Sequence, residues 1–173
     1  MTGQEAILAE SLVGANPVGA LAVWLVLGAV GGVAGAVAMD AAMHRQPDGW
    51  TPAFVAAAVL RRSRPDRVAF RDALVVHHVA GGLAGLLYGL VAYSTATLLG
   101  PAAPLSTLLG HVFGVVAVVA FIYAFFAHLV LPRGATGVYE ERATAVRGQW
   151  LRSSLVFGGV LLVSGLVVVA TVT

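Results

Sequence analysis

The sequence contains no cysteine and no lysine. The absence of cysteine excludes disulfides, iron–sulfur ligation and thiol catalysis. The absence of lysine excludes a Schiff base to retinal or pyridoxal phosphate. Charge is scarce as well: 10% of the 173 residues are charged, against about 25% in an ordinary soluble domain. Because 59% of the residues are hydrophobic, we expect a lipid bilayer to surround most of the chain.

The ten basic residues are all arginines, and they fall in two intervals, Arg45 to Arg71 and Arg133 to Arg152. Around these intervals run apolar segments, each longer than the roughly 20 residues that a helix needs to cross the hydrocarbon core. We therefore expect one all-α domain, an integral membrane four-helix bundle with short interfacial helices. The expected spans are residues 18–42, 73–99, 104–131 and 150–172, and the expected cytoplasmic loops are residues 43–72 and 132–149.

The arginines also predict the orientation. Loops rich in arginine stay on the cytoplasmic side during insertion, so we expect both of these loops inside and both termini outside the cell membrane. The N-terminal stretch has no basic region and is not expected to be a cleaved signal peptide. The arginines flank apolar segments and form no separate basic face, so no nucleic-acid partner is expected.

Local signals mark the helix ends. Asn16 is a suitable N-cap before Pro17, which suits the first position of a helix because it has no N–H to leave unpaired. In the first cytoplasmic loop, Thr51 is expected to cap a short amphipathic helix that begins at Pro52. We expect that helix to rest on its own bundle. A second short helix is expected at residues 5–13, on the outer surface.

Glycines at four-residue spacing predict how the spans associate. Small residues let helix backbones approach closely, which is what holds helices together where lipid is as apolar as the side chains. We expect the first two spans to pack as a hairpin through seven glycines: Gly28, Gly31, Gly32, Gly35, Gly81, Gly85 and Gly89.

Ionisable groups within the spans are candidates for function, because they are costly in a membrane and therefore rare. At 100° per residue, His78 falls on the glycine face of the second span and His77 falls at the edge of that face. His128 falls on a face of the third span with Gly114, and Asp40 lies to the side of the first span's glycine face. The predicted intramembrane polar cluster is Asp40, His78 and His128, with His78 and His128 as its best-aligned pair.

Three interpretations of this cluster stay open. The histidines could simply hydrogen-bond nearby carbonyls, tyrosines or headgroups. They could relay protons or bind a small ion together with Asp40, as part of an oligomer that transports protons, small ions or solutes. They could instead be the two axial ligands of a b-type haem. A zinc site is less expected, because two histidines and one uncertain carboxylate are a thin ligand set.

The stretch from Gly28 to Asp40, followed by the pattern from His78 to Gly89, resembles small four-span prokaryotic membrane proteins of haloarchaeal type, whose function is unknown. The resemblance implies a cell-membrane location and no activity. We expect a protein that is not an enzyme and has no cofactor. It is expected to act as an accessory or interaction subunit, with other membrane subunits, a second copy of itself and lipid as its partners.

Overall fold

The computed structural model describes residues 16–100, 104–134 and 141–172. Every element in these ranges is helical, and no β-strand occurs among them. The all-α fold class is thus confirmed. The short helix expected at residues 5–13 lies outside the described residues.

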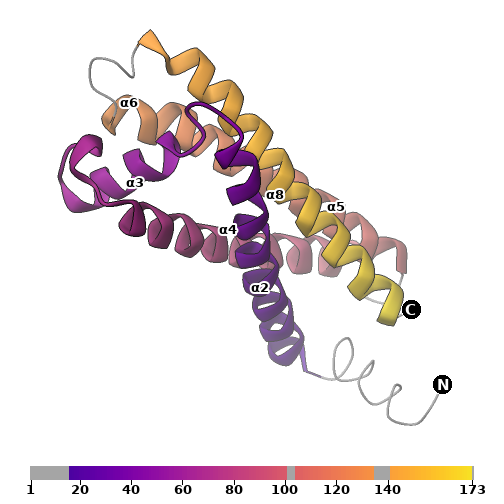
Figure 1. Cartoon of the computed structure of the whole chain (residues 1–173). Helices are drawn as coiled ribbons and strands as arrows, with labels where there is room; N and C mark the ends of the chain where they lie inside the picture. The colour runs from indigo at the N-terminus through magenta and orange to yellow at the C-terminus, as the bar shows by residue number, and fades with distance from the viewer. Residues whose placement is uncertain (1–15, 101–103, 135–140, 173) are drawn as a thin grey trace.

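Four long helices dominate the fold, as Figure 1 shows: α2 (Pro17–His44), α4 (Phe70–Leu98), α5 (Pro104–Phe125) and α8 (Ala143–Val172). The last turns after α5 are a π-helical segment, η2 (Phe126–Val130), and a short helix, α6 (Leu131–Gly134). Between α2 and α4 lie a shorter helix, α3 (Thr51–Arg61), and a 3-10 turn, η1 (Pro65–Arg67).

The four long helical stretches are long and apolar enough to cross a membrane: Pro17–His44, Phe70–Leu98, Leu105–Arg133 and Ala143–Val167. Each overlaps one of the expected spans. The fourth begins at Ala143 rather than at residue 150, so part of the expected second loop is helical. The fold therefore fits a multi-pass membrane protein.

The helix starts follow from local chemistry. The Asn16 side chain accepts hydrogen bonds from the amides of Val18 (3.0 Å) and Gly19 (3.4 Å), and Pro17 is the first residue of α2. Both predictions for this end are confirmed. The predicted cap of α3 is wrong by one residue: Thr51 is already helical, and Trp50 occupies the cap position without a capping side-chain bond.

The helices form a closed ring of neighbours. Helix α2 packs against α4 and α8, and α5 packs against the same two helices from the other side. Helix α3 packs against α4 and α6 at one end of this bundle, as Figure 1 shows. Its Val55 is fully buried with Phe126, Leu131 and Val146. The amphipathic helix thus rests on the bundle, as expected.

Glycines bring α2 and α4 into backbone contact. A Cβ atom added at Gly85 would lie 2.8 Å from both the carbonyl carbon of Gly28 and the Cα of Gly32. One added at Gly89 would meet the carbonyl group of Trp24. Such distances are shorter than any real Cβ contact, so a side chain at either position would force the two helices apart.

Two other glycines of α2, Gly31 and Gly35, contact α8 instead of α4. A Cβ atom at Gly35 would lie 2.7 Å from the ring of Phe157, and one at Gly31 would lie 3.2 Å from the Leu161 side chain. Phe157 and Leu161 belong to α8. The seven glycines therefore all lie at helix contacts, but Gly31 and Gly35 belong to the α2–α8 contact and not to the hairpin of α2 and α4.

Candidate functional site

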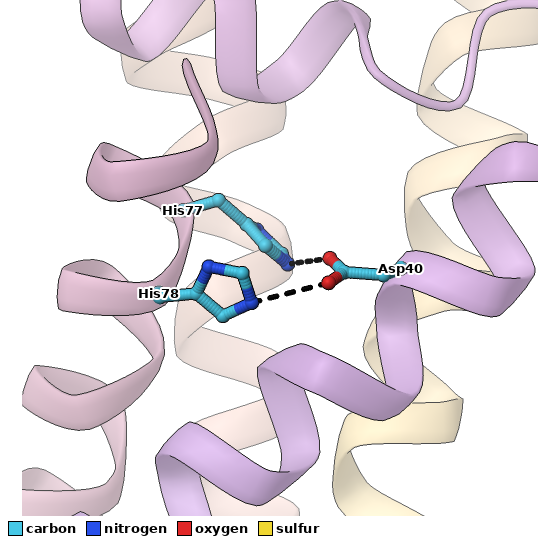
Figure 2. A group of neighbouring side chains, drawn as sticks. All are labelled: Asp40, His77 and His78. Carbon is cyan, nitrogen blue, oxygen red and sulfur yellow. Dashed lines mark hydrogen bonds and ion pairs between the residues drawn. The ribbon is translucent and has the colours of Figure 1, made fainter. Parts of the chain in front are cut away.

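A carboxylate and two imidazoles meet between α2 and α4. Figure 2 shows His77 and His78 of α4 directed at the carboxylate of Asp40 on α2. His77 Nε2 lies 3.3 Å from Asp40 Oδ1, and His78 Nε2 lies 3.1 Å from Asp40 Oδ2. Each residue offers one ligand atom such that all three atoms lie within 4.8 Å of one another. No other such group of three His, Asp or Glu side chains occurs in the part of the chain that the structure describes.

The packing of α2 on α4 places this group. Going down α4 in steps of four, Gly89 faces Trp24, Gly85 faces Gly28 and Gly81 faces Gly32. The next step brings His77 Nε2 to 3.1 Å from the Ala36 carbonyl oxygen. We call this antiparallel contact, from Trp24 and Gly89 to Ala36 and His77, the α2–α4 seam. Asp40 is one further turn along α2, so the candidate site is the end of the seam.

The hydrogen bonds of His78 fix its protons. Its Nδ1 lies 2.9 Å from the Leu74 carbonyl oxygen, which can only accept a hydrogen bond, so Nδ1 carries a proton and donates it. Its Nε2 faces Asp40 Oδ2, and one proton must lie between these two atoms. The Asp40–His78 pair is therefore neutral overall, either as carboxylate and imidazolium or as carboxylic acid and imidazole.

Asp40 retains unused binding capacity. His77 Nε2 donates to the Ala36 carbonyl oxygen, and although it lies 3.3 Å from Asp40 Oδ1, that oxygen is buried and accepts no hydrogen bond from any described residue. We take the hydrogen bond to Ala36 as the interaction that uses the His77 proton, because the 3.3 Å approach to Asp40 lacks hydrogen-bond geometry. A buried carboxylate oxygen without a donor is costly, and such an atom is suited to a bound cation.

The three side chains differ in exposure. The His77 side chain is 6% exposed, whereas those of Asp40 and His78 are 23% and 26% exposed. Trp50 packs edge-on against the His77 ring, at 5.8 Å between ring centroids, and also against Phe70. The indole thus covers His77 on one side, while Asp40 and His78 leave a way into the site from the protein surface.

An apolar cavity of about 290 Å³ adjoins the group. Its walls come from α2, α3, α4, α5, η2 and α8, and His77 is a polar member of a lining that is otherwise mostly apolar. On the far wall, Trp150 donates from its indole N–H to the Ile122 carbonyl oxygen at 3.2 Å. The imidazole of His77 therefore lies between the carboxylate of Asp40 and this apolar space.

The structure separates His128 from the predicted cluster. His128 is exposed, and it is not part of the group formed by Asp40 and the two adjacent histidines. The buried face of α5 follows His111, Val115 and Val118 and continues to Phe126; His128 follows two residues later, within the π-helical segment η2, and is exposed. The predicted alignment of His128 with the bundle interior is therefore wrong, whereas a haem bound by His78 and His128 stays a prediction.

The third residue of the site is His77, where the sequence pattern predicted His128. The azimuth of 100° per residue placed His77 at the edge of the glycine face. The actual contact follows the four-residue steps of the glycines themselves, and one further step from Gly81 is His77. The same rule applied to α2 leads from Gly28 and Gly32 through Ala36 to Asp40. These four-residue steps can be read from the sequence, and they would have identified His77.

A second polar contact lies near the other end of the bundle. His111 is fully buried on α5; its Nε2 donates to the Leu162 carbonyl oxygen at 3.0 Å, and its Nδ1 accepts from the Tyr88 hydroxyl at 2.5 Å. Both ring nitrogens are thus satisfied in one neutral tautomer. The contact joins α4, α5 and α8, and Gly165 provides the space for the ring. We interpret it as structural.

Alanine in place of Gly165 should destabilise the protein, because its Cβ would occupy the space of the His111 ring, 2.7 Å from Nε2. We expect a loss of about 2 kcal/mol, as for other overpacked cores, seen as a lower Tm in detergent. Gly159→Ala is the control on the same helix, because its Cβ would meet nothing within 4 Å. Equal Tm values for the two variants would contradict the structural role of this contact.

No protein-family model, curated protein or solved structure matches the chain. The resemblance to small four-span prokaryotic membrane proteins stays a prediction, and the site must be interpreted from its own geometry.

Proposed function

We propose that this chain is a multi-pass protein of the cell membrane that binds a small cation at Asp40, His77 and His78 and, as an oligomer, passes it across the bilayer. The observation that carries the proposal is the convergence of three ligand-type side chains on one point between two candidate membrane spans. Ionisable side chains within spans are costly and rare, and they are found along ion pathways and proton relays.

The charge of the group favours a cation over an anion or a neutral ligand. Once the proton shared by Asp40 and His78 is released, an ionised Asp40 beside two neutral imidazoles carries one negative charge, and a carboxylate oxygen and two ring nitrogens can bind a cation. In a medium of low dielectric such a charge needs a partner. The Oδ1 atom of Asp40 is buried and accepts no hydrogen bond from the described residues. A cation bound to this atom would offset the free-energy cost of burying it without a partner.

Passage across the membrane requires more than one copy in this proposal. The described helices form a ring of four neighbours, whose interior holds side chains such as Val118, Phe157 and Leu161 and a cavity whose lining is mostly apolar and offers an ion few ligands. A path for an ion would therefore run along the surface where Asp40 and His78 are exposed. A second copy packed on that surface would enclose it.

We further propose that the arginine-bearing segments face the cytoplasm, with the N-terminal end of α2 and the C-terminal end of α8 outside. The support is the positive-inside bias: the end of the bundle that holds α3 and η1 carries Arg61, Arg62, Arg64 and Arg67. Asp40, His77 and His78 would then lie in the inner half of the membrane.

The absence of cysteine allows a direct test of this orientation. A membrane-impermeant maleimide should label Thr97→Cys at the end of α4 in intact cells, because that exposed end should be outside. It should label Ser63→Cys, in the exposed segment between α3 and η1, only after the cells are permeabilised. The wild-type chain, which has no thiol, is the blank. The opposite labelling pattern would reverse the orientation.

Reconstitution in liposomes tests the cation proposal. We expect wild-type protein to dissipate an imposed gradient of protons or of a divalent cation, and Asp40→Asn to reduce that flux at least tenfold. Asp66→Asn is the control, because Asp66 is an exposed carboxylate in η1 that pairs with Arg64 at 3.2 Å. Equal flux from wild type and Asp40→Asn would refute the proposal.

The expected role as an accessory subunit stays a prediction, tested by co-purification with a larger membrane complex.

A further inference from the structure

We infer that the cation held by Asp40, His77 and His78 is a divalent transition metal of the Zn²⁺ class. The inference rests on the proposed function and specifies its ligand. Two imidazoles and a carboxylate are a donor set typical of zinc and of iron, cobalt or nickel, whereas Mg²⁺ and Ca²⁺ take oxygen ligands. The sequence alone gave a thinner set, because it left out His77.

The spacing of the donor atoms fits such an ion. Zinc binds nitrogen and oxygen at about 2.0–2.1 Å, so two ligand atoms at a tetrahedral angle lie about 3.3 Å apart. The His77 and His78 Nε2 atoms lie 3.3 and 3.1 Å from their nearer Asp40 oxygens. These two distances go to different oxygens of Asp40, and one ligand atom from each of the three residues lies within 4.8 Å of the others, so binding one ion in common would draw the three side chains closer together.

The surroundings of His78 are those of a metal ligand. A metal-binding imidazole usually donates its other N–H to a carbonyl or carboxylate, which fixes the tautomer and directs the lone pair at the metal. The Nδ1 of His78 makes this bond to the Leu74 carbonyl oxygen at 2.9 Å. Its Nε2 is then left for the metal once the proton that it shares with Asp40 is released, as metal binding requires.

His77 supplies the second nitrogen. Its Nε2 donates to the Ala36 carbonyl oxygen in the metal-free arrangement, so binding would require the neutral tautomer that carries the proton on Nδ1 and leaves the Nε2 lone pair for the ion. Gly81, one turn further along α4, keeps α4 close to α2, because a Cβ there would lie 2.9 Å from the Gly32 carbonyl oxygen. The exposed edges of Asp40 and His78 provide the entry for the ion and room for a fourth ligand such as water.

Cobalt substitution tests the inference, because tetrahedral Co²⁺ has strong visible absorption. Full-length protein should be purified in detergent with an affinity tag that lacks histidine, and then titrated with Co²⁺. We expect about one ion per chain with tetrahedral bands, displaced by Zn²⁺ but not by Mg²⁺. His78→Ala and Asp40→Asn should weaken binding by roughly 100-fold. His128→Ala, which changes an exposed histidine, should leave it unchanged.

The outcomes separate this inference from the proposed function. If folded wild-type protein does not bind Co²⁺ but its proton flux still depends on Asp40, the assignment of a transition metal is refuted. The proposal of cation transport is then retained. Binding that survives both Asp40→Asn and His78→Ala would place the metal elsewhere and overturn the inference. Metal binding lost in both variants, together with an absence of any flux, would support the metal site and refute transport. Circular dichroism confirms that each variant is folded.

Discussion

Alanine in place of Gly85 should unfold the protein at a markedly lower temperature than the wild type. A Cβ at this position would lie 2.8 Å from both the Gly28 carbonyl carbon and the Gly32 Cα, so α2 and α4 would have to separate along the seam. Backbone atoms cannot move aside as a flexible side chain can. We expect a loss of about 3 kcal/mol and a fall in Tm of roughly 5–10 °C in detergent.

The control for this prediction lies on the same helix. Gly82→Ala makes the same chemical change three residues away, where the added Cβ would meet the Val33 side chain at an ordinary 3.4 Å. Because alanine favours a helix over glycine by about 1 kcal/mol, its Tm should equal or exceed that of the wild type. The two variants are therefore expected to shift Tm in opposite directions. A common shift would mean that the seam is not the contact that holds α2 to α4.

Leucine at all three site positions should separate function from stability. Replacing a buried polar or ionic group by apolar side chains of similar volume is often neutral or stabilises the fold by about 1–4 kcal/mol. Surrounding lipid should favour the apolar side chains further. We expect the variant Asp40→Leu/His77→Leu/His78→Leu to have a Tm equal to or above that of the wild type, with cation flux abolished. A thermal scan and the liposome assay on the same preparation measure both quantities.

The single variant Asp40→Leu is the matched comparison. It removes the carboxylate and leaves the Nε2 atom of His78 without its hydrogen-bond partner, so it should be less stable than the triple variant. If the triple variant were instead the least stable of the set, the group would be a structural tie between α2 and α4. The site would then be explained by hydrogen bonding alone.

Much of the fold could be predicted from the sequence, because the physics that determines it is local. Apolar length and the scarcity of charge predicted four long helices, and Asn16 and Pro17 predicted the start of α2. The start of α8 could not be found from apolar length, since that helix begins in the polar stretch at Ala143 before the apolar run. Its first turns are helical although they carry Arg147 and Arg152.

The site was predicted only in part, because its composition depends on how two helices cross. Asp40 and His78 were identified and do meet, at 3.1 Å. His77 was passed over because an ideal azimuth was used for a contact that follows four-residue steps. His128 was included for the same reason, on a third helix whose buried face lies elsewhere. Following the glycines in steps of four residues, instead of assigning a whole helix face, includes His77 on α4 and leaves out His128 on the third span.

X-ray absorption at the zinc edge can show whether Asp40, His77 and His78 together hold one cation. We expect a first shell of nitrogen and oxygen at about 2.0–2.1 Å, with outer-shell scattering from two imidazoles. One imidazole should disappear in His77→Ala and one in His78→Ala. A spectrum of the zinc-loaded wild type without imidazole scattering would contradict a cation site at Asp40, His77 and His78. A spectrum that neither variant changes would contradict it as well.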